Sequence, residues 1–555
     1  MRFFRSAALL SFVVAASCDA APTGGTTTPP TGIVGAVTSV LVTPGSATLF
    51  VGGSAQFSAV ARDAAGRTVV TASVSWSSTD GTVASVNSSG QVSALKVGNA
   101  TITATVSGIS GSAAIGVQAP PAGSGDVIVN AGVTYQTMRG WEAHEQSAHE
   151  HPSFPQFKDE LFDRAVNELG INRIRLEMWS GTEQDTDYYT QWLNGQLDNN
   201  GWRCKRFATV NDNGDPQSIN WSGFQFSKID KVVNDVIKPL QQRLQARGEQ
   251  LHINLLYDAF TGQITGPGCS GGQYHHDDDP EEFAEFVLAN FIHLRDDFGI
   301  VPQSFELLLE PNNTLWWTKG RQLGEALVAT MVRLNANGFN PRVIAPSNSQ
   351  AGQVLPFLDE IAKAPGALQL IDELSYHRYD WPANSVVQGI RARAAALGIE
   401  TSMLEFDSGA DQQTLYDDIV HGNVSAWQQF ALAFQQTPPY NDKGGVYYII
   451  DVANAGNPQV VMASRTRFLS QYFKYVREGA VRIGATSTTN GVAPLAFLNS
   501  NGKMVVVANI TGSRSFTVGG LAAGTYDITY TTSSVLQASG GSVTIVSGQE
   551  IPVSV

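Results

Sequence analysis

The sequence contains few cysteines and few charged residues for its length. Three cysteines among 555 residues are too few for a disulfide-rich scaffold, and no metal-binding motif can be built from them. Charged residues make up 15%, against about 25% in typical globular chains, whereas hydrophobic residues make up 43%. This combination argues against disorder, which requires high charge and few apolar residues. The chain is therefore expected to form sizeable folded cores.

Basic patches are also lacking. The net charge is −14, from 35 basic and 49 acidic residues, and no cluster of Lys or Arg stands out. A nucleic-acid partner is not expected, because phosphate binding needs a concentrated positive surface. The mild acidic excess fits a protein whose partner is neutral or weakly charged.

No apolar run is long enough to cross a membrane as a helix. The apolar stretch 7–16 follows two arginines in the first five residues, which predicts a signal peptide over 1–18. It ends in Ala-Ala-Ser-Cys, which resembles a bacterial lipoprotein cleavage site and predicts lipidation of Cys18. Ordinary cleavage near Ala20 or Ala21 is the alternative. The protein is expected to be exported, either secreted or as a cell-surface or periplasmic lipoprotein that meets the membrane only through its anchor.

Residues 34–118 follow a linker over 19–33 and show short alternating strands with frequent turns, the pattern of a β-sandwich. They resemble the bacterial immunoglobulin-like group 2 domain in VTPGSATLFVGGSAQFSA, in Trp76 within VSWSS, and in GQVSALKVGNATITAT. The resemblance implies a spacer or adhesive module. We expect Trp76 to lie in its core, and a second linker to span 119–125.

Between residues 126 and 479 apolar strands alternate with amphipathic helical stretches. Eight such units in order predict a multidomain chain centred on a (β/α)8 TIM barrel. The strands are expected near 138–143, 171–179, 251–258, 304–311, 342–348, 371–379, 399–407 and 444–451, and the helices near 157–169, 226–247, 280–298, 320–337, 354–364, 384–397, 413–436 and 464–477. Short strands from 480 to 555 predict a C-terminal β-sandwich, to which 126–136 adds a strand.

The active site of such a barrel lies at the C-terminal ends of its strands. Glu310 and Glu405 end strands four and seven, and each follows an almost wholly apolar run. These strands lie on opposite sides of the barrel mouth, so the two carboxylates are expected to face each other, as retaining glycoside cleavage requires. A single glutamate at a strand end is as readily explained by a structural ion pair, but two at these positions are more specific.

Residues 126–555 resemble the clan A retaining glycoside hydrolases, and family 30 most closely. The resemblance rests on YQTMRGWEA (135–143), IRLEMW (174–179), Glu310-Pro311, YHRY (376–379) and Glu405 in MLEFD. It implies that Glu310 is the acid/base, that Glu405 is the nucleophile held ionised by Arg175, and that His377 and Tyr379 line the −1 sugar site. The other candidate substrate-binding residues are Trp141, Asp258, Asn312, Trp316, Trp317 and Tyr448.

One position departs from the family pattern. Leu309 precedes Glu310, where the family has an asparagine that binds the sugar 2-hydroxyl. Three explanations remain open: another residue such as Asn312 supplies this hydrogen bond, the substrate is unusual at that carbon, or activity is weak.

Tryptophans and cysteines gather in the expected rim loops. Because aromatic faces pack on sugar rings, a tryptophan-rich rim suits a glycan cleft, although the same residues could anchor long loops. Those close to strand ends are Trp179, Trp316, Trp317 and Trp381, and those in the long insertion after strand two are Trp192, Trp202 and Trp221. Cys204 and Cys269 fall in the loops after strands two and three, which are neighbours, so we expect a disulfide between them.

The sequence therefore predicts an exported protein and leaves more than one function open. The leading hypothesis is a retaining glycoside hydrolase that cleaves a β-linked polysaccharide, endo-acting and monomeric. The alternatives are an exo-acting β-glycosidase and a non-catalytic glycan-binding or adhesion lipoprotein. No cofactor, metal or nucleic-acid partner is expected, since Asp277, Asp278 and Asp279 before Pro280 are typical of a helix cap and an acidic first turn.

Overall fold

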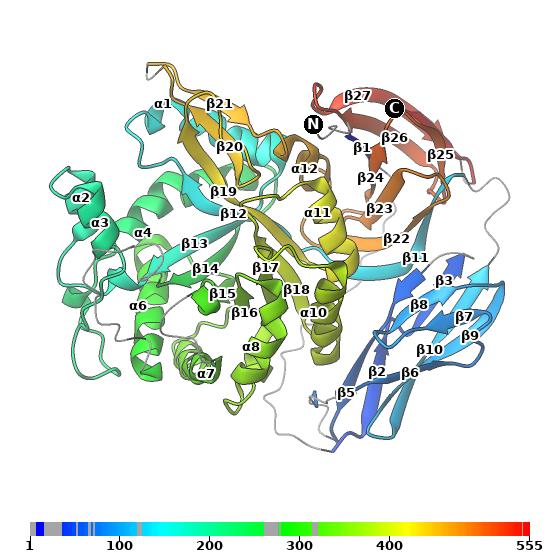
Figure 1. Cartoon of the computed structure of the whole chain (residues 1–555), viewed down its shortest axis with the longest axis horizontal. Helices are drawn as coiled ribbons and strands as arrows, with labels where there is room; N and C mark the ends of the chain where they lie inside the picture. Colours follow the sequence, from blue (N-terminus) through cyan, green and yellow to red (C-terminus); the bar gives the residue numbers. More distant parts are fainter. Residues whose placement is uncertain are drawn as a thin grey trace.

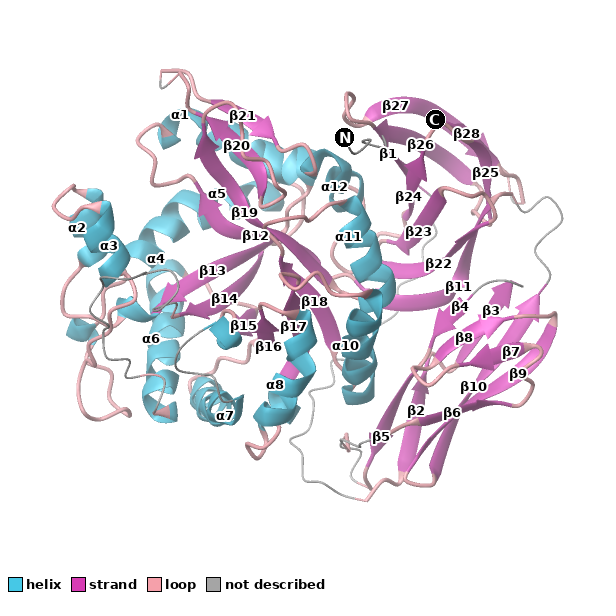
Figure 2. Cartoon of the chain, in the orientation of Figure 1, coloured by secondary structure: helices cyan, strands magenta, loops and turns pink. Residues whose placement is uncertain are grey.

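The computed structural model describes residues 7–15, 36–50, 54–64, 68–69, 73–118, 125–259, 276, 279–313, 320–454, 456–546 and 548–555. They form an N-terminal group of strands, a central barrel ringed by helices, and a C-terminal group of strands (Figures 1 and 2). Among these residues, none of the helices is both long and apolar enough to cross a lipid bilayer.

The N-terminal group is the expected immunoglobulin-like β-sandwich. Alternating residues face one core, and Trp76, which was expected inside it, is only partly buried and packs against it. The strands are β2 (Ser39–Thr43), β3 (Ser46–Phe50), β4 (Ser54–Gln56), β5 (Ser58–Arg62), β6 (Ser75–Ser78), β7 (Ala84–Val86), β8 (Gln91–Ala94), β9 (Gly98–Val106) and β10 (Ile109–Gln118).

Polar contacts hold this domain against the rest of the chain. The Asn130 amide donates to the Thr48 carbonyl at 2.7 Å, and the Tyr135 hydroxyl donates to the Ser54 carbonyl. The Arg391 guanidinium, on a barrel helix, donates to the Gln56 side chain. Figure 1 shows the domain beside α10 (Asn384–Leu397) and below the C-terminal strands.

The central part is a closed barrel of eight parallel strands, which confirms the predicted fold class. The strands pair in chain order and the first pairs with the last. They are β12 (Gly140–Ser147), β13 (Arg173–Trp179), β14 (His252–Asp258), β15 (Ser304–Glu306), β16 (Arg342–Asn348), β17 (Ile371–His377), β18 (Glu400–Glu405) and β19 (Ala426–Gln436).

The eighth strand was predicted wrongly. Residues 444–451 were expected to close the barrel and 413–436 to form a helix, but the helix ends at Gly422 and β19 closes the barrel. Apolar residues recur in β19 at Trp427, Phe430 and Ala431, a helical spacing. A closing strand is buried on both faces, so its pattern does not follow the period of two. The expected strand is β20 (Val446–Asp451), which with β21 (Gln459–Met462) extends the sheet beyond β19.

Most outer helices lie where the apolar periodicity places them. Asp279 caps α6 by accepting from the Glu281 amide at 2.9 Å, as expected for the acidic stretch before Pro280. The helices are α1 (Phe154–Asp163), η1 (Arg164–Leu169), α4 (Ser227–Val232), η4 (Val233–Ile237), α5 (Lys238–Gln245), α6 (Pro280–Phe298), α7 (Gly320–Ala336), α8 (Val354–Ile361), α9 (Ala367–Leu370), α10, α11 (Gln412–Asp417), η7 (Asp418–Gly422) and α12 (Thr466–Phe473).

The long insertion after β13 is only partly helical. It contains η2 (Ser180–Thr182), α2 (Tyr188–Leu193), α3 (Asn199–Lys205) and η3 (Trp221–Gly223). Figure 1 shows α2 and α3 at the edge of the barrel farthest from the C-terminal strands.

The C-terminal strands form one antiparallel-rich sheet that includes residues from before the barrel. β11 (Val127–Thr137) pairs with β22 (Val481–Ser487) and β25 (Ser515–Gly519). The rest are β23 (Val492–Leu498), β24 (Met504–Thr511), β26 (Gly524–Thr531), β27 (Ala538–Ile545) and β28 (Ile551–Ser554). In the full chain β1 (Ala7–Ala15), from the expected signal peptide, lies between β24 and β26. The export signal stays a prediction.

Candidate active site

Three candidate residues stand at the carboxyl ends of neighbouring or facing barrel strands. His377 ends β17, Glu405 ends β18, and Glu310 follows β15 by four residues. The Glu310 amide donates to the Ser347 carbonyl at 3.1 Å, and its backbone has a φ of 47°. A positive φ is uncommon outside glycine, so the fold holds this glutamate in a constrained turn at the barrel mouth.

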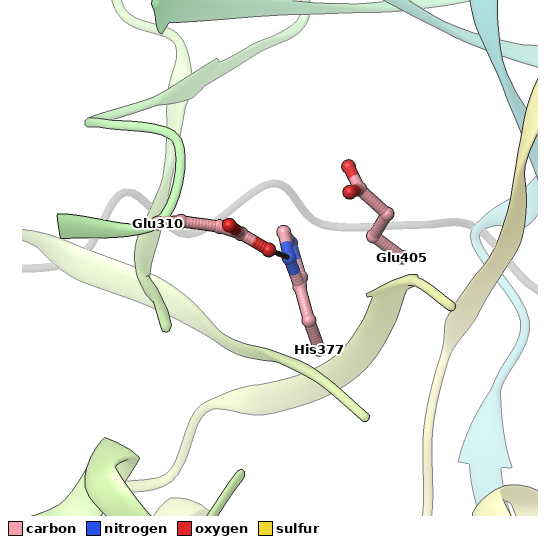
Figure 3. Close-up of side chains that lie close together, drawn as sticks. All are labelled: Glu310, His377 and Glu405. Atoms are coloured by element: carbon pink, nitrogen blue, oxygen red, sulfur yellow. Dashed lines mark hydrogen bonds and ion pairs between the residues drawn. The ribbon is translucent and has the colours of Figure 1, made fainter. Parts of the chain in front are cut away.

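The two glutamates lie close enough to act on one bond. One carboxylate oxygen of Glu310, one of Glu405 and one ring nitrogen of His377 all lie within 4.8 Å of one another. Figure 3 shows the two carboxylates on either side of the imidazole, which contacts Glu310. Retaining glycosidases hold their two carboxyl groups about 5–5.5 Å apart. Both glutamates are 6–7% exposed, so the space between them is sheltered but reachable.

Glu405 is surrounded by groups that favour its charged form. The Arg175 guanidinium, fully buried on β13, donates to one carboxylate oxygen, and the Tyr379 hydroxyl donates to the other at 2.7 Å. Burial opposes ionisation of Glu405, but Arg175, His377 and Tyr379 together outweigh it and hold its pKa below the usual value. Arg175 therefore contacts the carboxylate with which the family resemblance pairs it.

Glu310 instead has one neutral neighbour, an amide, and one titratable neighbour, an imidazole. The His377 Nδ1 lies 2.8 Å from one carboxylate oxygen, and the Asn313 amide donates to the other at 2.6 Å. Burial lowers the pKa of His377, but Glu405 and Glu310 outweigh it and raise the pKa above its usual value. Asn313 was not singled out from the sequence. Its place in the turn η5 (Pro311–Asn313), directly after Glu310, was the available signal.

A second layer supports the strand-two side of the site. The His144 Nε2 lies 2.5 Å from one oxygen of Glu177, and the Trp179 indole donates to the other at 2.7 Å. Burial opposes the charge on Glu177, yet His144 and Lys228 lower its pKa. Trp179 is therefore fixed by a buried carboxylate and does not project freely into the mouth.

Two predicted substrate-binding residues lie elsewhere. Trp141 is fully buried, stacks on Phe473 with centroids 4.4 Å apart and donates to the Val476 carbonyl at 2.6 Å. It packs against the C-terminal end of α12, away from the two glutamates. Tyr448 is also fully buried, and Arg164 lies over its ring at 5.4 Å. It stands on β20, outside the closed barrel. Both predictions were wrong because they relied only on the position of each residue in an expected strand. They did not take into account the side of the strand on which the side chain lies.

Asn312 and Asp258 lie at the mouth but already have protein partners. The Asn312 amide donates to Ser349 Oγ at 2.6 Å, and its oxygen accepts from the Ser349 amide at 2.9 Å and from Asn348 at 3.2 Å. Asp258 ends β14 and is buried, and its charge favours the protonated form of the nearby Arg206. The side-chain amide of Asn312 is therefore already hydrogen-bonded and is not free to bind a sugar hydroxyl.

Leu309 belongs to an apolar cluster beside the site. It is 6% exposed and clusters with Phe207 and Leu256, and Trp179 packs against the group. Phe207 comes from the long insertion, so this loop packs against Leu309, at the position where the resemblance predicts an asparagine.

The aromatic and cysteine predictions have mixed outcomes. Trp202 is buried and Trp192 stacks on it at 5.4 Å, so both anchor the insertion. Trp381 is 65% exposed and meets Phe406 edge-on, with ring centroids 4.8 Å apart, so most of its side chain is accessible to solvent. Cys204 lies in α3 of the insertion. Four predicted residues lie outside the described part of the chain, so their roles and the pairing with Cys204 stay predictions: Cys18, Cys269, Trp316 and Trp317.

Two comparisons with known sequences match part of this chain. The family description "Bacterial Ig-like domain (group 2)" matches residues 36–117. Ice-binding protein 1 of Shewanella frigidimarina (strain NCIMB 400) is 42% identical over 77 residues, which are 14% of this chain and 9% of that protein. The chain thus spans less than a tenth of the length of that relative.

Solved structures share the fold over 77–80% of this chain. The catalytic domain of GH30 xylanase C from Talaromyces cellulolyticus has a TM-score of 0.53 at 15% identity, covering 77% of this chain and 96% of that one. A conserved exported protein from Bacteroides fragilis gives 0.54 at 13% identity, with 77% and 98% covered. SrfJ from Salmonella typhimurium gives 0.52 at 13% identity, with 80% and 93% covered.

Proposed function

We propose that this chain is a retaining glycoside hydrolase in which Glu310 is the acid/base and Glu405 the nucleophile. The observation that carries the proposal is the pair of carboxylates within 4.8 Å at the ends of facing strands, in unlike surroundings. Glu405 is kept ionised by a buried arginine, as a nucleophile requires, while Glu310 is flanked by an imidazole and an amide.

The reaction then runs in two steps. A carboxylate oxygen of Glu405 attacks the anomeric carbon while Glu310 gives its proton to the departing glycosidic oxygen, so an ester bond forms as the glycosidic bond breaks. Donors from His377 and Asn313 stabilise the carboxylate left on Glu310. In the second step Glu310 takes a proton from water, the water oxygen attacks the anomeric carbon, and Glu405 is released.

The substrate under this proposal is a β-linked polysaccharide cut internally. The likeness to a domain named as a xylanase supports the β-linkage. The long insertion after β13 and the exposed Trp381 support a rim with several sugar sites. An exo-acting β-glycosidase is the second candidate. Export, with or without a lipid on Cys18, and a Cys204–Cys269 disulfide belong to the same proposal.

The test is hydrolysis of xylan, β-glucans and galactan by the full chain and three variants. Glu405→Gln is expected to reduce turnover to background, and Glu310→Gln to reduce it by roughly 10²–10⁴-fold. Glu400→Gln is the matched control, because this glutamate begins the same strand β18 and pairs with Arg139 at 2.8 Å. Product chromatography separates internal cleavage from release of single sugars, and proton NMR of the first product reads the anomer.

Three results would contradict the proposal. Undiminished hydrolysis by Glu405→Gln would remove the nucleophile, and an inverted first product would remove double displacement. Tight glycan binding by the wild type with no hydrolysis on any substrate would favour the adhesion alternative.

A further inference from the structure

A second group of acidic side chains lies apart from the Glu310–Glu405 pair. Glu183 and Asp212 come from the long insertion after β13, and Glu282 comes from the first turn of α6. One carboxylate oxygen of each lies within 4.8 Å of the other two. Three like charges this close repel unless a proton or a cation lies between them.

Glu285, one turn along α6, provides an independent sign of a missing partner. It is 1% exposed, and neither of its carboxylate oxygens has a hydrogen-bond partner among the residues that the structure describes. The like charges that act on Glu285 are those of the three cluster members Asp212, Glu282 and Glu183, and together with burial they raise the pKa of its carboxyl group to about 8. A buried carboxyl group without a partner is costly.

The protein groups near the cluster do not neutralise it. Asp212 also has one buried oxygen without a partner in the described part of the chain. Arg333, the arginine that acts on Glu285, forms its own ion pair with Glu281 at 2.7 Å. Glu183 contacts His276 with one oxygen and accepts from the Asp212 amide with the other, and Glu282 is hydrogen-bonded to Asn211. Within this group, the oxygens without a described partner are one of Asp212 and both of Glu285.

The cluster has a defined shape because backbone amides hold its loop. The Asp212 amide donates to Glu183 at 2.7 Å, and the Asn220 amide donates to Asp212 at 2.5 Å. The same loop meets α6 again where Gln217 donates to Glu281 at 3.1 Å. The carboxylates are therefore held in place by a folded loop and a helix.

We propose that Glu183, Asp212, Glu282 and Glu285 bind one calcium ion. Calcium takes six to eight oxygen ligands and accepts carboxylates in one- or two-oxygen contact, whereas a site of this kind offers nothing to soft metals. The ion would join the insertion to α6 and so brace the rim of the barrel on the side of strands two and three. The sequence predicted no metal, because the four ligands come from three separated segments.

Calcium binding by the full chain tests this, with no need for a substrate. Chelator-treated protein is titrated with CaCl2 by calorimetry, with MgCl2 in parallel, and its thermal midpoint is measured with and without calcium. We expect one calcium ion per chain, weaker magnesium binding and a higher midpoint with calcium. Glu285→Gln and Asp212→Asn should each weaken calcium binding by about tenfold or more, because ligand charge sets affinity.

Two controls make the result specific. Asp296→Asn removes an exposed charge from the same helix α6, and Glu405→Gln removes a carboxylate from the barrel mouth, where Glu310, His377 and Glu405 form the other group able to hold a cation. Both are expected to keep wild-type calcium affinity. No stoichiometric binding at millimolar calcium, equal binding of magnesium, or a loss of binding in Glu405→Gln but not in Glu285→Gln would each overturn the proposal. Circular dichroism checks that each variant is folded, and the wild-type titration decides the question if one is not.

Discussion

Replacing Arg175 by glutamine is the most informative single change, because it removes the cation from a buried pair while leaving Glu405 in place. Arg175 is fully buried, donates to the Glu405 carboxylate, and is the first of the groups that offset the burial of that carboxylate. In the variant Glu405 keeps its burial and the Tyr379 hydrogen bond but loses its strongest support.

The size of the effect follows from the contact. Loss of an adjacent cation raises a carboxyl pKa by about 1–3 units, so the acidic limb of the kcat/KM profile should move up by that amount. Removing one partner of a buried pair costs about 3–5 kcal/mol of stability at neutral pH. The wild-type pKa of Glu405 is lowered, so the pair stabilises the fold above the unfolded pKa and that stabilisation is lost as pH falls through the folded pKa.

The variant should reverse this dependence. If burial raises the pKa of Glu405 above its unfolded value, the variant loses stability as pH rises through that range, whereas the wild type gains it. Denaturant unfolding between weakly acidic and neutral pH measures the sign, and a pH–rate profile measures the limb. Arg139→Gln is the control, because Arg139 pairs with Glu400 at 2.8 Å but is 36% exposed, and such pairs are worth about 0–1 kcal/mol. An unmoved acidic limb in Arg175→Gln would refute the reasoning.

Three further substitutions have defined expected outcomes. Tyr379→Phe removes the 2.7 Å hydrogen bond to Glu405 and should lower kcat/KM by roughly tenfold or more, with a loss of about 1–3 kcal/mol in stability; equal kinetics would show that the bond does not matter for activity. Leu309→Asn should not raise activity and should cost about 1–3 kcal/mol in denaturant unfolding, because it places an amide against Phe207; improved turnover would contradict this account. Trp141→Ala should cost about 3–5 kcal/mol with KM little changed, and a selective rise in KM would return this residue to the substrate site.

Residue order along the chain predicted the positions that chemistry requires. Glu310 and Glu405 could be assigned to strands four and seven from the apolar runs before them, and the structure places both at the barrel mouth. Arg175 was identified through its motif and contacts Glu405. These assignments succeeded because a parallel barrel always presents the ends of its strands on one face.

The errors share one physical origin. Whether Trp141 faces the mouth or an outer helix depends on the tilt and twist of β12, and whether residues 426–436 form a strand depends on burial of both faces. The partners of Asn312 likewise come from β16 and the residues that follow it, far away in the sequence. Local patterns carry no information on these choices.

The sequence by itself determined the immunoglobulin-like domain, the barrel class and the two strand-end glutamates, because alternation, helix periodicity and strand order are local properties of the chain. Only the tertiary structure decided that Leu309 meets Phe207, that Asn313 donates to Glu310, and that the three acidic groups of Glu183, Asp212 and Glu282 converge from separate segments. Such convergence depends on how loops pack across the barrel rim, and that packing is fixed by long-range contacts between segments.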